Sequence, residues 1–295
     1  MPGPRNGRIH LLAAVVVLAG FTVPEARGQG NIGPAAGLVD ILPGAIQFVD
    51  GRPGEGVFFL GGTAALGGWA LWAEGRRRTG ELNAPLVYAQ QFWVAGLCDG
   101  ENRRAPGHGD PSPLSSLVLA PFRPSAAFDP WVLAFVGAGT GLNVWLARRE
   151  HGEGFRRISR INYLGGSWGR DEGTAVYGSY WVPISLGAGV SEEMLFRGLL
   201  QTRWEERYGT VPGWFMASGL FGAAHLTRLD DREALLNAGF AAVAGLYLGW
   251  RYRDEGYRLE KPIAAHFWFD VAAGVTAFVW DPLNNPLGAR ITFAL

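Results

Sequence analysis

Apolar residues along this chain come in long runs, most of them separated by short polar segments. The runs lie at 57–73, 86–97, 131–147, 174–189, 211–225, 234–250 and 262–280. A helix needs about 20 residues to cross the hydrocarbon core of a bilayer, and most of the runs reach or approach that length. We therefore predict an all-α fold, a polytopic transmembrane helix bundle. The run at 86–97 and the segment 114–121 are short enough to be half-spans or surface helices.

The first 28 residues have the organisation of a signal peptide. Arg5 and Arg8 precede a short apolar run at 11–21, and the tripeptide Ala-Arg-Gly at 26–28 has small residues at the positions of a cleavage site. The run is short for a span, which favours a cleaved signal over an uncleaved anchor helix. We expect a multi-pass protein of a bacterial inner membrane whose mature chain starts on the outer side.

Two polar segments interrupt the apolar pattern, one at 103–113 and one at 148–173 that carries six arginines. We predict both as solvated loops. The second separates an N-terminal hydrophobic region, 29–147, from a C-terminal region, 174–295. The positive-inside rule puts this basic loop on the cytoplasmic side. Alternation then places Arg251 and Lys261 on the other side, which the rule disfavours, so we expect one span to be wrong or re-entrant.

The composition agrees with a membrane protein. Only 18% of the residues are charged, against about 25% in soluble domains. The formal net charge is zero and there is no basic stripe, so we expect no nucleic-acid partner. The single cysteine, Cys98, excludes an intramolecular disulfide and a cysteine-based metal site, and we interpret it as a packing residue.

Ionisable residues stand inside the apolar runs of the C-terminal region, where a charge costs roughly 2.5 to 3.5 kcal/mol at bilayer depth. Glu193 and Arg197 are four residues apart with the acid first, the better order for an ion pair on one helical face. Glu192 points about 100° away from Glu193, and it is a candidate general base. The alternative is an interfacial helix whose charges face water, as the charges at 203–207 also suggest.

Two histidines, His225 and His266, lie within apolar runs. A lone histidine on an apolar helix is more often a hydrogen-bonded packing residue than a ligand or catalyst. Two of them downstream of a glutamate pair favour a functional site. His266 and Asp270 are four residues apart and share a helical face. We predict that three helices point Glu192, His225, His266 and Asp270 into one pocket that water reaches.

These residues form three motifs on successive predicted helices: Glu-Glu-x-x-x-Arg at 192–197, Phe-x-x-x-His at 221–225 and His-x-x-x-Asp at 266–270. In this order they resemble the CPBP family of intramembrane proteases, which includes the CAAX prenyl endopeptidases of the Rce1 type and the bacterial Abi proteins. The resemblance covers residues 174–280. It implies a CPBP-type C-terminal core, an intramembrane endopeptidase activity, and as partners the lipid bilayer and a peptide or membrane-protein substrate.

The resemblance also implies a role for each site residue. Glu192 is the catalytic glutamate, and His225 helps it to activate a water for attack on the scissile carbonyl. His266 and Asp270 stabilise the oxyanion, and the motif positions 193 and 197 form a structural pair. The better-studied enzymes have asparagine where this chain has Asp270. An amide donates a hydrogen bond to an oxyanion, whereas an ionised carboxylate repels it, so we expect Asp270 either to be uncharged or to orient His266.

Other interpretations use the same residues. Glu192, His225 and His266 resemble the ligand set of a catalytic zinc site, but the chain lacks the close His-x-x-x-His spacing of helical zinc proteases, so we favour catalysis without a cofactor. The departure at Asp270 and the added N-terminal region suggest a non-catalytic membrane scaffold or a bacteriocin-immunity or envelope protein. A proton-coupled transporter ranks last because no inverted repeat is visible. Finally, Gly245-x-x-x-Gly249 predicts a close helix contact that joins the His225 and His266 helices.

Overall fold

The computed structural model describes residues 42–75, 79–104, 109–150, 154–163, 165–285, 287 and 289–293. The predicted signal peptide at 1–28, with Arg5, Arg8 and the predicted cleavage site, lies outside the described residues. The predicted division of the chain at 28, 147 and 173 stays a prediction.

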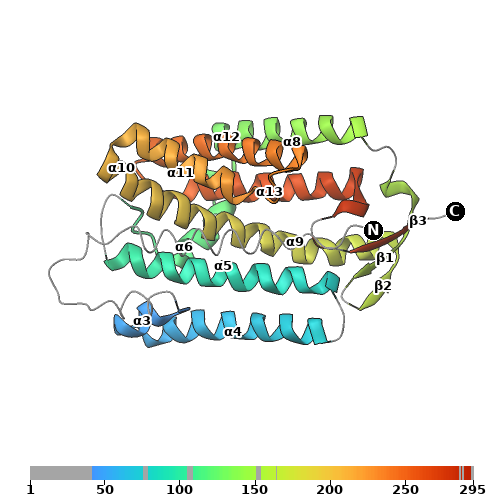
Figure 1. The fold of residues 1–295 in the computed structure, drawn as a ribbon, viewed down its shortest axis with the longest axis horizontal. Helices are drawn as coiled ribbons and strands as arrows, with labels where there is room; N and C mark the ends of the chain where they lie inside the picture. The colour runs from blue at the N-terminus through green and yellow to red at the C-terminus, as the bar shows by residue number, and fades with distance from the viewer. Residues whose placement is uncertain are drawn as a thin grey trace.

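Helices dominate the fold and run side by side along the long axis of the molecule (Figure 1). The long ones are α4 (Pro53–Gly75), α5 (Thr79–Arg104), α8 (Pro130–Glu150), α9 (Arg170–Glu193), α11 (Thr210–Ala224), α12 (Arg232–Asp254) and α13 (Glu260–Trp280). The short ones are α3 (Ala45–Val49), α6 (Leu114–Leu119), η1 (Ala120–Phe122), α7 (Pro124–Ala127), η2 (Phe155–Arg157), η3 (Met194–Gln201), α10 (Thr202–Tyr208) and η4 (Pro282–Asn284). Each predicted apolar run is helical. The run at 86–97 is the middle of the 26-residue α5 rather than a half-span.

Two described helices are long and apolar enough to cross a membrane, at 53–73 in α4 and at 260–280 in α13. The other predicted spans are helical but do not meet the same criterion of length and apolarity among the described residues. Large apolar side chains are nevertheless exposed along the outer faces of several long helices: Phe58 and Leu71 on α4, Leu133 and Leu142 on α8, Phe215 on α11, and Leu236 and Val243 on α12. Exposed apolar surface of this extent is typical of a protein that meets lipid or a partner.

The basic segment at 148–173 is not the solvated loop that we predicted. Helix α8 continues to Glu150, and β1 (Ile158–Tyr163) pairs antiparallel with β2 (Gly166–Trp168) and with β3 (Arg290–Phe293), in the order β2-β1-β3. The inner side of this sheet packs on α9, where a Cβ atom on Gly173 would lie 2.6 Å from Ile161. The charges of β1 indicated a loop because the side of the strand that is buried is recognisable only in the folded sheet. The fold is all-α in class, as predicted, and carries this small sheet at one end.

The main core lies where α5, η3, α11 and the end of α12 meet. Cys98 is part of it and is fully buried, in agreement with its predicted packing role. Gly245 allows α12 to approach α11, because a Cβ atom there would lie 3.1 Å from the Cα atom of Ser218. The small-residue motif therefore brings α12 against α11, the helix before His225. It does not join the His225 and His266 helices directly, as we had expected.

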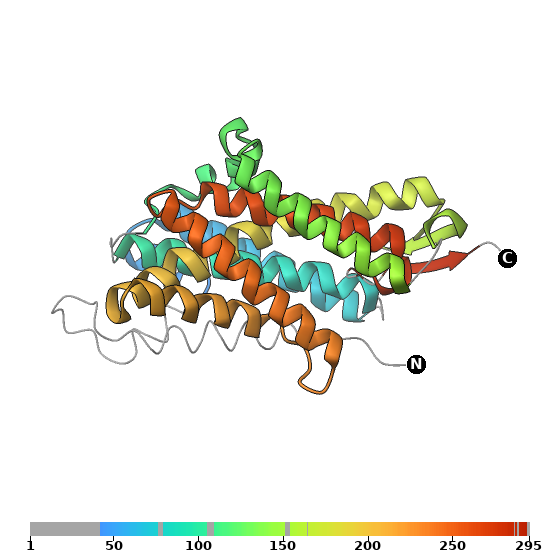
Figure 2. The same ribbon diagram turned by 90° about the horizontal axis from the view of Figure 1, so that it is seen from above.

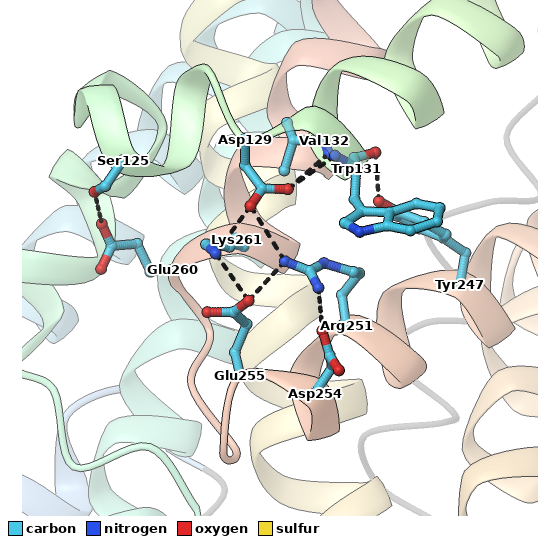
Figure 3. A network of polar contacts seen from close by, with 10 residues as sticks. All are labelled: Ser125, Asp129, Trp131, Val132, Tyr247, Arg251, Asp254, Glu255, Glu260 and Lys261. Atoms are coloured by element: carbon cyan, nitrogen blue, oxygen red, sulfur yellow. Dashed lines mark hydrogen bonds and ion pairs between the residues drawn. The ribbon is translucent and has the colours of Figure 1, made fainter.

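A network of charges ties the turn between α12 and α13 to the start of α8 (Figure 3). Arg251 is only 2% exposed and contacts Glu255 at 2.6 Å and Asp129 at 3.4 Å. Lys261 contacts the same two carboxylates at 2.8 and 2.9 Å. Asp129 also accepts a hydrogen bond from the backbone N–H of Val132 in the first turn of α8. Burial raises the pKa of Asp129, but these donors and the Arg251 charge outweigh it and hold the pKa below its usual range.

Candidate active site

A buried ion pair forms the floor of the candidate site. Glu193 ends α9 and Arg197 lies in the π-helical segment η3 that follows, with side chains that are 0% and 1% exposed. Arg197 Nη1 lies 3.0 Å from Glu193 Oε1, and Nη2 donates a hydrogen bond to the carbonyl oxygen of Gly245 at 3.1 Å. The Arg197 guanidinium also lies 4.4 Å from the centre of the Phe221 ring. This burial does not fit the interfacial helix that we considered, whose charges would face water.

His266 connects α13 to this pair. Its Nδ1 atom lies 2.7 Å from Glu193 Oε1. Because an ionised carboxylate can accept hydrogen bonds but not donate them, the Nδ1 atom of His266 carries the hydrogen and donates it. The other ring nitrogen, Nε2, lies 3.5 Å from Asp270 Oδ2 and 4.0 Å from Glu192 Oε2. The His266 ring is therefore held from below by Glu193, and its Nε2 atom points to the remaining carboxylates.

Glu192 and His225 lie above the floor, with Glu192 Oε2 at 3.9 Å from His225 Nε2. His225 directly follows the last residue of α11, and its Nδ1 atom donates a hydrogen bond to the carbonyl oxygen of Phe221 at 2.8 Å. In the neutral ring this leaves a lone pair on Nε2, on the side of Glu192. A separation of 3.9 Å is too long for a direct hydrogen bond and is suited to one bridging water.

Solvent reaches the upper residues but not the floor. The side chains of Glu192, His225 and Asp270 are 16%, 25% and 27% exposed, whereas the Glu193–Arg197 pair is shielded. The structure thus brings together all four residues that we predicted for the pocket, from three helical segments. Their catalytic roles stay predictions.

Two aromatic residues shape the site and were not part of the predicted set. The Phe221 ring is buried, and its centre lies 4.6 Å from that of His225 and 5.8 Å from that of His266. Trp181 of α9 donates a hydrogen bond to the backbone carbonyl of Asp270 at 3.0 Å. Its indole occupies the space beside Gly274, where a Cβ atom would lie 1.9 Å away. Trp181 is 89 positions from Asp270, so no local pattern could have indicated this contact.

The metal interpretation concerns the same pocket. Among the described residues, no group of three or more His, Cys, Asp or Glu side chains is arranged to hold a metal ion. Glu192, His225 and His266 do lie next to one another, at the separations given above.

Comparison with known families adds a match to this geometry. The family model described as type II CAAX prenyl endopeptidase Rce1-like matches residues 176–272. Residues 176–272 are thus similar to the Rce1-like family. The resemblance that we stated from three motifs is thereby confirmed, and the matched segment, about a third of the chain, contains Glu192, His225, His266 and Asp270. No curated protein and no solved structure matches the chain.

The match indicates the broad class to which residues 176–272 are similar. The Rce1-like family is a family of helical, membrane-embedded proteases, which supports proteolytic activity, a lipid environment and a peptide or protein substrate for this chain. The two apolar helices long enough to cross a bilayer agree with this class.

Proposed function

We propose that the Rce1-like core is an intramembrane endopeptidase that hydrolyses a peptide bond with a water activated by Glu192 and His225. The observation that supports it is the position of Glu192 Oε2, which lies 3.9 Å from His225 Nε2 and 4.0 Å from His266 Nε2. A carboxylate and two imidazoles that face one point, partly open to solvent above a buried ion pair, have the arrangement of a hydrolytic site. The apolar outer faces of α4, α8, α11 and α12 support a multi-pass protein of a bacterial inner membrane.

The first step in this proposal is attack by water. A water between Glu192 and His225 donates one hydrogen bond to Glu192 Oε2 and the other to His225 Nε2. These two hydrogen bonds direct a lone pair of the water oxygen toward the scissile carbonyl carbon. Glu192 takes up the first proton as the water oxygen bonds to the carbonyl carbon. The tetrahedral intermediate then collapses, and Glu192 returns the proton to the leaving amine. Without a cofactor, the two residues supply the proton transfers and the positioning.

His266 stabilises the oxyanion in this proposal. Its Nδ1 hydrogen is engaged by Glu193, so Nε2 carries a hydrogen only when the ring is an imidazolium. The carboxylates of Glu193 and Asp270 balance the positive charge of this imidazolium from two sides. Asp270, at 3.5 Å from Nε2, then orients the ring rather than donating to the oxyanion itself, in the way that a carboxylate orients a ligating histidine.

Replacing Asp270 tests this assignment. In Asp270→Asn the amide keeps the size of the side chain and adds a donor for the oxyanion, so we expect kcat to be at least that of the wild type. In Asp270→Ala the ring loses its orienting group, and we expect kcat to fall by about ten-fold or more. Steady-state cleavage rates in proteoliposomes check both results. A large loss in the asparagine variant would contradict the orienting role.

Hydrolysis itself is tested with labelled water. Proteoliposomes of the full chain are incubated with membrane-tethered peptides in H₂¹⁸O, and the products are analysed by mass spectrometry. We expect one ¹⁸O atom in the new carboxyl group, and a loss of about 10²- to 10⁴-fold in rate for His225→Ala, because general acid–base groups contribute that much. Full activity in the presence of a zinc chelator supports the cofactor-free route. Absence of any product from the wild type favours the scaffold interpretation.

A further inference from the structure

The small sheet at the end of the bundle has an outer side that the proposed chemistry does not use. In the register of the strands, Asn162 pairs with Ser167 on one side and with Arg290 on the other, and Arg160 pairs with Thr292. Paired residues of an antiparallel sheet point to the same side, and the inner side is taken by Ile161 and its neighbours. Five polar residues therefore share the outer side: Arg160, Asn162, Ser167, Arg290 and Thr292.

The arginines on and next to this side of the sheet have no acidic partner among the described residues. Arg160 and Arg290 are exposed, as are Arg156 and Arg157 in the turn η2 that leads into β1. Arg160 has a long contact with the Ser167 hydroxyl at 3.4 Å. Within the part of the chain that the structure describes, none of these four guanidinium groups forms an ion pair with a carboxylate. We call these four residues the arginine face.

The opposite end of the bundle is different. There, cations at the ends of α5, α10 and α12 and at the start of α13 contact carboxylates. Examples are Arg104 with Asp50 at 2.9 Å, Arg203 with Glu101 at 2.9 Å, Arg123 with Glu260 at 3.2 Å and Lys261 with Asp129 at 2.9 Å. Both ends carry arginines, but the four residues of the arginine face take part in no ion pair of this kind among the described residues.

The arginine face also has a defined position relative to the apolar surface. Trp72, one turn before the end of α4, and Trp145, near the end of α8, are exposed. Both helices end at the same end of the bundle as the sheet (Figure 1), and the end of α8 lies close to the sheet in the second view as well (Figure 2). Tryptophan is enriched at the level of lipid headgroups. With the two indoles at that level, the sheet lies just beyond the apolar surface, where the phosphates of a leaflet are found.

We propose that the arginine face binds the headgroups of anionic phospholipids in the leaflet at this end of the bundle. A guanidinium group engages a phosphate with two parallel hydrogen bonds, and Ser167, Asn162 and Thr292 offer further polar contacts between the arginines. Anionic lipid complements the uncompensated charge. This interaction is independent of peptide hydrolysis and holds the sheet end of the bundle at one membrane surface.

The test uses the full chain purified in detergent and a soluble short-chain phosphatidylglycerol. The apparent Kd is measured by thermophoresis, with short-chain phosphatidylcholine, inorganic phosphate and a polyglutamate peptide as parallel titrants. We expect phosphatidylglycerol to bind best. In Arg160→Gln/Arg290→Gln its apparent Kd is expected to rise by about five-fold for each arginine removed. Arg160→Lys/Arg290→Lys keeps the charge but not the paired hydrogen bonds of the guanidinium group, and its apparent Kd should lie between those of the wild type and the Gln variant.

A matched variant controls for the change in net charge. Arg207→Gln/Arg228→Gln removes two exposed arginines elsewhere and is expected to bind phosphatidylglycerol as the wild type does, with an unchanged melting temperature for both double variants. Equal loss in both double variants overturns the proposal, because it makes the effect one of net charge. Equally tight binding of phosphate or polyglutamate overturns the lipid assignment.

Discussion

Replacing Glu192 by glutamine is expected to lower kcat by about 10²- to 10⁴-fold, the usual contribution of a general base. The amide has the shape of the carboxylate but cannot take a proton from water. Because glutamine has the size of glutamate and Glu192 is not part of the buried Glu193–Arg197 pair, we expect the fold to be unaffected. Cleavage rates in proteoliposomes and melting curves in detergent measure the two effects separately.

Two further variants sharpen this test. Glu206→Gln makes the same change at an exposed position in α10 and should retain wild-type activity. Glu192→Gln/His225→Ala should be little worse than the stronger single variant, because residues that act on one water are not additive in their effects. A product of the two single losses would mean that Glu192 and His225 act independently, and retained activity in Glu192→Gln would end its assignment as the base.

Replacing Arg197 by methionine is expected to destabilise the fold by about 3 to 5 kcal/mol, because it leaves the Glu193 carboxylate buried without its cation. Arg197 also donates to Gly245 and lies against Phe221, so the substitution removes three contacts at once. The free energy of unfolding is measured by denaturant titration in detergent micelles.

The control for this substitution is a pair of the same type near the surface. Arg203 contacts Glu101 at 2.9 Å with both side chains partly exposed, so Arg203→Met should cost no more than about 1 kcal/mol. The double variant Glu193→Gln/Arg197→Met removes the unpaired charge and should recover part of the lost stability. Equal costs for Arg197→Met and Arg203→Met would show that the pair at the floor contributes no more than a surface pair.

The sequence was sufficient to locate the helices and to predict which ionisable side chains of one helix lie together. Long apolar runs located the helical segments, because a helix that faces lipid or a core needs a long apolar stretch. Four-residue spacing placed Glu193 with Arg197 and His266 with Asp270. Spacing within a helix fixes which side chains share a face. It also allowed the family resemblance to be stated from three short motifs.

Contacts between distant segments were beyond the sequence. Strand β1 pairs with β3, which is more than 120 positions away, and its inner side is recognisable only once that pairing exists. The Trp181 contact with Asp270 and the approach of α12 to α11 depend likewise on packing. The charges of the segment 148–173 indicated solvent, and Arg156, Arg157 and Arg160 are exposed, but Arg160 lies on one side of a folded sheet.

Glu193 Oε1 accepts hydrogen bonds from both Arg197 and His266, and one oxygen atom thus links α9, η3 and α13. With the Trp181 hydrogen bond to Asp270, α9 and α13 form a rigid frame that carries Glu192, His266 and Asp270. His225 enters from the end of α11 and meets this frame at Glu192, whose Oε2 atom lies 3.9 Å from His225 Nε2, and through Phe221, whose ring lies against Arg197. The hydrolytic centre therefore joins two carboxylates and a histidine on hydrogen-bonded helices to a second histidine that aromatic packing places.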